Sequence, residues 1–319
     1  MSEPIQICDQ PGCKKPATLS YRWDWGEEGI CCLEHGQLLQ QKSQSLSRGV
    51  ALTPLGTAAP APLTRDERTQ LIAAKLSAEA EADEIKHRMY ARWNQKIFGG
   101  KFMRDLEAGQ LPMETIRLFW KHWYSYPVEI NNFHLIIYQR HQGFFARHRE
   151  LLAPYVGKIS DELVNPSIPG HIQVLIKQGE AFGVTMDEMV SCEVFPECRA
   201  LTEFGRGLVY EGSMIEWWAR SLNEEMFGHW AQRWRQALLE KYHFKESDLH
   251  YFQVHEEADL HEHEDGLMAH GEVARKVFET LLGDGLTWYR PGWSPEYCCL
   301  TNADYVAMFH DGIYKHSRE

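Results

Sequence analysis

The feature that most constrains this chain is a succession of long segments with helical periodicity from residue 64 to the C-terminus. In "METIRLFWKHWYSYPVEINNFHLIIYQRH", and again in "ECRALTEFGRGLVYEGSMIEWWARSLNEEMFGHWAQRWRQALLEKYHF", apolar residues recur at three- and four-residue spacing. This spacing places them on one face of an α-helix. Alternating patterns that would indicate strands are scarce in this part. The sequence therefore predicts an all-α domain of about seven helices.

Composition narrows the class of protein. The 319 residues carry a formal net charge of -12 with no basic block to offset it, which argues against a nucleic acid or an anionic membrane as partner. No run of about 18 apolar residues predicts a membrane span. The N-terminal "MSEPIQICDQPGC" lacks the basic and apolar regions of a signal peptide, so we expect a cytoplasmic protein.

The first fifty residues contain half of the eight cysteines. Cys8 and Cys13 form one pair, and Cys32 and His35 form a second pair after a hairpin-sized interval, with Cys31 as an alternative to Cys32. Two such pairs can surround a tetrahedral zinc ion. A segment this short has little core of its own, so metal would supply folding energy. The spacing predicts one structural zinc, with ordinary buried or surface thiols as the alternative.

Changes in composition suggest three parts. We expect a Cys/His zinc-binding module over residues 1–48, zinc-ribbon-like or zinc-finger-like in fold. A linker rich in Ala, Pro, Thr and Gly should follow over residues 49–65, and a helical domain over residues 66–319.

The densest group of potential ligands is "HEEADLHEHEDGLMAH", which begins at His255. If the stretch is one helix, Asp259 and Glu262 share a face with His255, because they follow it by four and seven residues. His261 and His263 would then point toward solvent. The stretch therefore divides into a candidate ligand row and a solvated face.

Two upstream segments offer further candidates. In "SDELVNPSIPGHIQVL", prolines interrupt the helix, so Glu162 and His171 could reach one site although nine residues separate them. In "SLNEEMFGHW", Glu224 and Glu225 lie in an otherwise apolar helix, where an acid is costly unless it is paired or metal-bound. The alternative is that both glutamates are surface residues.

Three stretches resemble the heme-oxygenase-like di-iron oxidases, whose fold is shared with TenA and PqqC. "YFQVHEEADLHEHE" resembles the His-x3-Asp-x2-His signature of these proteins, and "DELVNPSIPGHIQVLIKQGEAFGVTMDEM" resembles the element that precedes it. "LEAGQLPMETIRLFWKHWYSYPVEINNF" is similar to their early helix pair. The resemblance covers residues 66–319 and not the cysteine module. It implies a heme-oxygenase-like bundle.

The resemblance also implies a set of metal ligands. The corresponding positions are Glu162, His171, Glu224, His255, Asp259 and Glu262, with Glu225 as an alternative to Glu224. They would hold two iron ions, or manganese.

One position departs from the pattern, because the third residue of the signature is Glu262 where the family has His. Glu262 could serve as an oxygen ligand, which suits iron or manganese. A distortion of the helix could instead bring His261 or His263 inward. In the third alternative one metal position is lost.

The activity implied is that of an O2-dependent di-iron oxidase or oxygenase acting on a small amine, amino-acid derivative or aliphatic acid. Four tryptophans could line its pocket, although aromatics at helical spacing are more typical of plain core: Trp217, Trp218, Trp230 and Trp234. The alternatives are a metal-free enzyme of the PqqC/TenA type and a non-enzymatic zinc-module adaptor. The chain could form a homodimer.

Overall fold

The N-terminal part folds around a small sheet. The computed structural model describes residues 6–10, 13–23, 28–46, 49–55, 65–165, 170–261 and 268–318. Strands β1 (Leu19–Trp23), β2 (Glu28–Cys31) and β3 (Val50–Pro54) form an antiparallel sheet in the order β2-β1-β3. Helix α1 (Leu33–Leu46) follows β2 directly.

The sheet corrects one predicted boundary. Residues 50–54, which we placed in the linker, form β3 and pair with β1 from Leu19 opposite Pro54 to Trp23 opposite Val50. The module therefore extends to residue 55. The strand was not predicted from the sequence because β3 is short and lies at the edge of the sheet, and its Ala-Leu-Thr-Pro composition resembles that of a linker.

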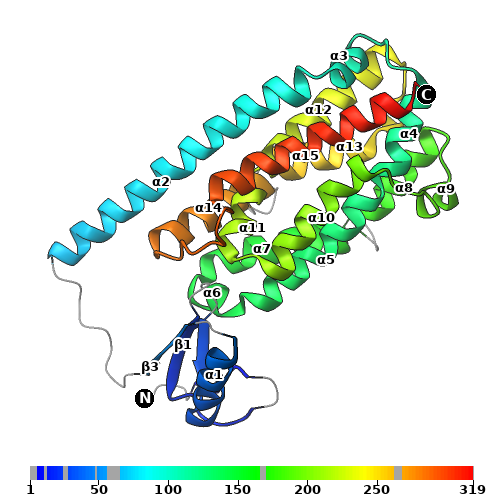
Figure 1. The fold of residues 1–319 in the computed structure, drawn as a ribbon. Coiled ribbons are helices and arrows are strands. Elements are labelled where there is room, and N and C mark those ends of the chain that lie inside the picture. Colours follow the sequence, from blue (N-terminus) through cyan, green and yellow to red (C-terminus); the bar gives the residue numbers. More distant parts are fainter. Residues whose placement is uncertain are drawn as a thin grey trace.

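The described residues from 65 onward are mainly helical, as predicted, and form an elongated bundle (Figure 1). Its α-helices are α2 (Arg65–Trp93), α3 (Lys101–Glu107), α4 (Met113–Trp123), α5 (Ser125–Arg140), α6 (Gln142–Arg147), α7 (Arg149–Leu163), α8 (His171–Ala181), α9 (Met186–Val190), α10 (Pro196–Glu211), α11 (Met214–Ser221), α12 (Glu224–Lys241), α13 (His250–Leu260), α14 (His270–Gly283) and α15 (Pro295–His316). A π-helical turn (Asn94–Phe98) and a 3₁₀ turn (Glu246–Asp248) complete it.

The described helices exceed the expected seven because several long segments are divided. The segment around Pro127 splits into α4 and α5, and Pro127 lies in the first turn of α5, where its missing N–H costs nothing. The segment from residue 196 to 242 divides into α10, α11 and α12, with Ser213 capping the first turn of α11.

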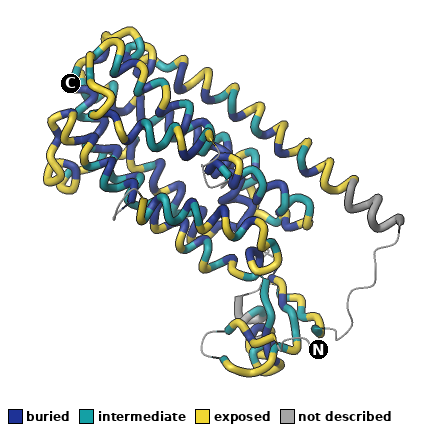
Figure 2. The backbone as a smooth tube through the Cα atoms, turned by 180° about the vertical axis from the view of Figure 1, so that it is seen from behind, coloured by how far each residue is buried: buried dark blue, intermediate teal, exposed yellow. Residues whose placement is uncertain are grey.

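The helices bury their apolar faces against one another. Helix α12 packs on α13, α15 packs on α10 and α11, and α14 packs on α2. Figure 2 shows the buried residues on the inward faces of the bundle and the exposed residues on its outer surface. Within the described ranges, no helix is both long and apolar enough to cross a membrane.

The module touches the bundle at α6. Strand β2 lies against this helix, and the Arg147 guanidinium pairs with the Glu28 carboxylate. Gly143 allows the close approach, because a Cβ at this position would collide with the backbone carbonyl of Glu28. The module nevertheless has its own hydrophobic cluster, separate from the core of the bundle.

Candidate metal centre

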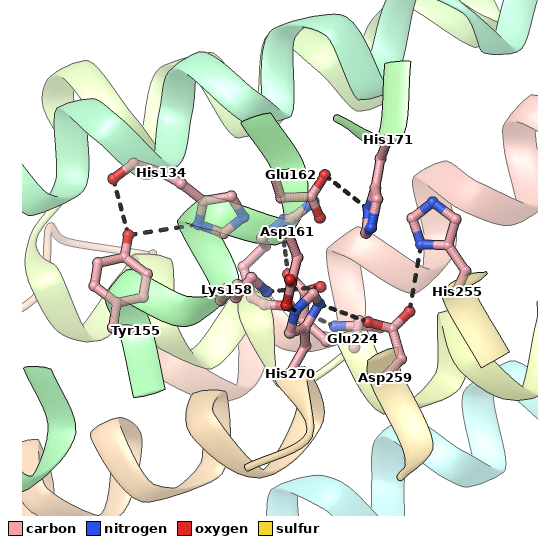
Figure 3. Close-up of polar contacts among 12 residues, drawn as sticks. His134, Tyr155, Lys158, Asp161, Glu162, His171, Glu224, His255, Asp259 and His270 are labelled. Carbon is pink, nitrogen blue, oxygen red and sulfur yellow. Dashed lines mark hydrogen bonds and ion pairs between the residues drawn. The ribbon is translucent and has the colours of Figure 1, made fainter. Parts of the chain in front are cut away.

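Acidic and histidine side chains from five helices converge inside the bundle, as Figure 3 shows. They come from the end of α7, the start of α8, the start of α12, the last turns of α13 and the start of α14. Helix ends position most of them, so the connections between helices decide how they meet.

The first pair is Glu162 on α7 and His171 on α8. Glu162 Oε2 lies 3.3 Å from His171 Nδ1, and both side chains are almost fully buried. Gly170 makes this possible, because its φ of 68° is a conformation that favours glycine and a Cβ there would collide with the Glu162 carbonyl. Asn131 holds the same carbonyl by donating a hydrogen bond of 3.0 Å.

The charges around this pair favour the ionised form of Glu162. Burial alone would raise the pKa of Glu162, but the neighbouring His171 imidazole lowers it well below its usual value. Glu162 therefore stays ionised in spite of its burial.

The second group lies on α12 and α13. Glu224 and Asp259 face the cluster, and His255 lies one turn before Asp259 with its Nδ1 3.8 Å from Asp259 Oδ2. Glu225 points elsewhere, because its carboxylate pairs with Lys86 of α2 at 2.6 Å. Of the two adjacent glutamates, Glu224 is thus the one that faces the cluster.

His270, the first residue of α14, joins the cluster without having been assigned a role from the sequence. Its Nδ1 lies 3.2 Å from Asp259 Oδ1 and its Nε2 lies 3.3 Å from Asp161 Oδ2. Burial alone would lower the pKa of His270, but hydrogen bonds to Asp161 and Asp259 raise it to about 9. Burial alone would raise the pKa of Asp259, but the neighbouring imidazoles of His255 and His270 lower it to about 2.

The approach of α14 depends on Gly271. A Cβ at this position would lie 3.1 Å from the backbone nitrogen of Glu225, closer than most real contacts. The missing side chain lets the start of α14 pack against the start of α12, which brings His270 toward Glu224.

The structure changes the interpretation of Glu262. Glu262 was expected to share a face with His255 on a continuous helix, but α13 ends at Leu260 and His261 has extended backbone (φ -120°, ψ 144°). The phase that put Glu262 beside His255 therefore does not apply. Glu262 and His263 lie outside the described residues, and His261 is exposed.

Two buried cations adjoin Glu224. Lys158 Nζ lies 2.9 Å from Glu224 Oε2, and Arg220 Nη1 lies 3.6 Å from Glu224 Oε1. Arg220 also donates hydrogen bonds to the Tyr126 hydroxyl and, at 3.1 Å, to Asn302 Oδ1. The ionised Glu224 is thus compensated by fixed positive charge within the protein.

A small cavity of about 50 Å³ adjoins the cluster. Its polar end is formed by members of the cluster and Arg220, and its apolar wall is formed by Trp123, Tyr126, Pro127, Ile130, Phe227, Trp230 and Tyr251. Of the four tryptophans considered from the sequence, Trp230 lines this cavity. Trp217, Trp218 and Trp234 are fully buried core residues and do not line it.

The donor set fits divalent iron or manganese. Glu224, Asp259 and His270 each offer one ligand atom, and these atoms lie within 4.8 Å of one another. His255 Nε2 is buried and has no hydrogen-bond partner among the described residues. Oxygen and imidazole ligands together suit these metals. Glu162 and His171 supply a further pair of donors beside them.

Solved structures of other proteins share the architecture of the bundle. A domain of unknown function with a heme oxygenase-like fold from Shewanella denitrificans OS217 matches with a TM-score of 0.58 and 10% identity, over 74% of this chain and 93% of that one. The helical domain has the heme-oxygenase-like fold.

Two TenA homologues match as well. The protein from P. horikoshii OT3 has a TM-score of 0.52 and 16% identity, over 73% of this chain and 97% of that one. The homologue from Pseudomonas syringae pv. tomato DC3000 has a TM-score of 0.52 and 16% identity, over 77% and 92%. At this identity the likeness concerns the fold, which confirms the fold predicted from the sequence. No family model and no curated protein matches the chain.

Sequence reasoning missed three members of the cluster. His270 opens a new amphipathic helix and precedes a glycine, which was the available signal for a residue at a close helix contact. Lys158 and Asp161 precede Glu162 by four residues and by one, and Lys158 therefore lies one turn away on the same face of α7.

Proposed function

We propose that the helical domain is an O2-dependent non-heme di-iron oxidase or oxygenase that acts on a small organic substrate. The observation that carries this proposal is the convergence of buried carboxylates and imidazoles from five helices on one point beside a cavity. The proposed ligands are Glu162, His171, Glu224, His255, Asp259 and His270, for two iron ions or manganese. His270 replaces Glu262 in this set.

The protein's own residues would prepare the site. Iron, when bound, supplies the capacity to bind O2 and reduce it. The aromatic wall of the cavity, which includes Trp123 and Tyr251, excludes water and receives the apolar part of a substrate. Trp123 Nε1 donates a 2.9 Å hydrogen bond to the Tyr251 hydroxyl, which fixes both rings. Asp161 orients the His270 ring through its second nitrogen, as outer partners of metal-bound imidazoles do.

A second candidate is supported by the ion pairs of Glu224. Because Lys158 and Arg220 already compensate this carboxylate, the cluster can exist without metal. The domain would then be a metal-free enzyme of the PqqC/TenA type that uses buried acids and bases. A cavity of small volume with an aromatic wall suits a small organic substrate in either case.

Metal content separates the two functions. The full chain is loaded anaerobically with Fe(II), desalted and assayed for iron per chain and for O2 consumption after mixing with air-saturated buffer. The di-iron function predicts about two irons per chain and rapid O2 uptake. In Asp259→Asn iron should be lost. Glu257→Gln is the matched control, because Glu257 lies on the same helix and is exposed.

Other results would contradict the proposal. Iron that stays at wild-type level in Asp259→Asn would place the metal elsewhere. A chain that takes up no iron under anaerobic loading would favour the metal-free enzyme. If it also lacks activity toward small amines, amino-acid derivatives and aliphatic acids, the non-enzymatic adaptor remains.

A further inference from the structure

We propose that Cys8, Cys13, Cys32 and His35 bind one structural zinc ion, which folds the N-terminal module. This site is independent of the function proposed for the helical domain. The four residues lie far from the acidic cluster in sequence. Cys8 and Cys32 belong to a hydrophobic cluster separate from the core of the bundle, and Cys13 packs against it.

The distances between the four side chains match a tetrahedral site. Cys8 Sγ and Cys32 Sγ each lie 3.4 Å from His35 Nδ1, and Cys13 Sγ lies 4.0 Å from Cys32 Sγ. Zinc–ligand bonds of about 2.3 Å for sulfur and about 2.0 Å for nitrogen place tetrahedral ligands about 3.8 Å apart for two sulfurs and about 3.5 Å apart for sulfur and nitrogen. The ligand atoms therefore already surround a space of the size of one zinc ion.

Two separate segments present these ligands. Cys8 and Cys13 lie on the segment before β1, which is fastened to β2 because the Ile30 N–H donates a 2.8 Å hydrogen bond to the Asp9 carboxylate. Cys32 directly follows β2, and His35 lies in the first turn of α1 three residues later. Both ligand pairs are thus fixed by backbone elements.

The structure also distinguishes between the adjacent cysteines. Cys32 Sγ belongs to the cluster, whereas Cys31 is fully buried in the core of the module and is not part of it. Because successive residues at the end of a strand point to opposite sides, only one of them can face the metal. Cys31 therefore provides a matched control for Cys32.

Zinc would be needed because the module has so little core. Its buried cluster consists of Cys8, Tyr21, Trp23, Cys31, Cys32 and Leu39, and three of these six are cysteines. Domains of this size rarely fold on hydrophobic burial alone, and a structural metal commonly supplies the missing free energy. Four protein ligands fill a tetrahedral site, so the ion would be structural and not catalytic.

The test uses the full chain with zinc and cobalt as probes. Wild-type protein is reconstituted with Zn(II), desalted and assayed by elemental analysis, alongside Cys32→Ala, Cys13→Ala and Cys31→Ala. We expect one tightly held zinc in wild type and in Cys31→Ala, and none at this site in the other two. Co(II) should give a thiolate-to-metal absorption band in the same two proteins, which the acidic cluster cannot produce because it has no sulfur.

Hydrogen exchange reports on the role of the ion. Removing zinc with a chelator should abolish amide protection in β1, β2 and α1 and leave α12 and α15 protected. Thiol titration of the denatured protein should find all eight cysteines reduced. The proposal is overturned if wild type binds no zinc, if Cys31→Ala and Cys32→Ala lose it equally, if the module stays protected without zinc, or if only six thiols react, which would indicate a disulfide.

Discussion

Lys158 Nζ lies 2.9 Å from Glu224 Oε2, and the lysine side chain is only 1% exposed. The pair joins α7 to α12 at the centre of the candidate metal site. A buried ammonium is tolerated there because an ionised carboxylate faces it. Any metal that binds Glu224 must therefore share this carboxylate with Lys158.

Replacing Lys158 should have opposite effects on stability and metal affinity. In Lys158→Met the metal-free protein should lose about 3 kcal/mol of unfolding free energy, because Glu224 loses its closest counter-charge. Fe(II) should bind about tenfold more tightly, since the metal no longer competes with an ammonium. Denaturant unfolding with and without metal measures the change in stability, and equilibrium iron titration measures the change in affinity. Lys177→Met, at an exposed position of α8, is the control. Weaker iron binding in Lys158→Met would show that Glu224 is no ligand.

His270 and Glu262 are alternative candidates for one ligand position of the proposed metal site. We expect His270→Ala to lower the iron content from about two per chain to about one, because Asp259 would lose its nearest imidazole partner. Glu262→Gln should keep the wild-type content. The iron content of each variant is measured after anaerobic loading. Loss of iron in Glu262→Gln but not in His270→Ala would show that Glu262 is the ligand.

Iron affinity should depend on the close backbone contact at Gly271, which positions His270. In Gly271→Ala the new Cβ would meet the Glu225 backbone at about 3 Å, so α14 must shift and move His270. Iron affinity should fall at least about tenfold while the far-ultraviolet circular dichroism stays unchanged. Gly283→Ala on the same helix is the matched control, because a Cβ there meets nothing within 4 Å. Equal affinities for the two variants would contradict the role given to this contact.

His141 should make the bundle sensitive to acid. Burial lowers its pKa to about 3, and neither ring nitrogen has a hydrogen-bond partner among the described residues. The unfolded chain binds a proton near pH 6.5 and the folded chain does not, so this contribution is complete above pH 6.5 and declines as the pH falls. Between pH 7 and pH 4 it amounts to about 3 kcal/mol.

The variant His141→Phe isolates this contribution. Its unfolding free energy, measured by urea on metal-free protein, should fall by about 3 kcal/mol less than that of wild type between pH 7 and pH 4. His87→Gln, an exposed histidine on α2, should follow wild type. Parallel curves for all three proteins would show that His141 takes up its proton in the folded state.

The periodic apolar positions were sufficient to predict the bundle, because burying one face of each helix is a local requirement that the sequence displays directly. The spacing of histidines and carboxylates, together with the resemblance to the di-iron oxidases, selected Glu162, His171, Glu224, His255, Asp259 and Glu262 as candidates. The first five lie in the cluster, and Glu262 lies outside the described residues. Boundaries were harder to predict. The helical pattern was expected to continue past Leu260, where α13 ends. The pairing of β3 with β1 joins segments distant in sequence.

The sequence by itself determined that the chain beyond residue 64 is mainly helical and which of its residues are costly to bury. Only the tertiary structure decided which charges meet. His270 and Lys158 enter the site through helix contacts that span more than sixty residues of sequence, and Cys31 and Cys32 differ only in the side of the strand end that they face. Periodicity shows which face of a single helix is buried, but not what that face contacts. A set of metal ligands depends on the distances between several helices at once.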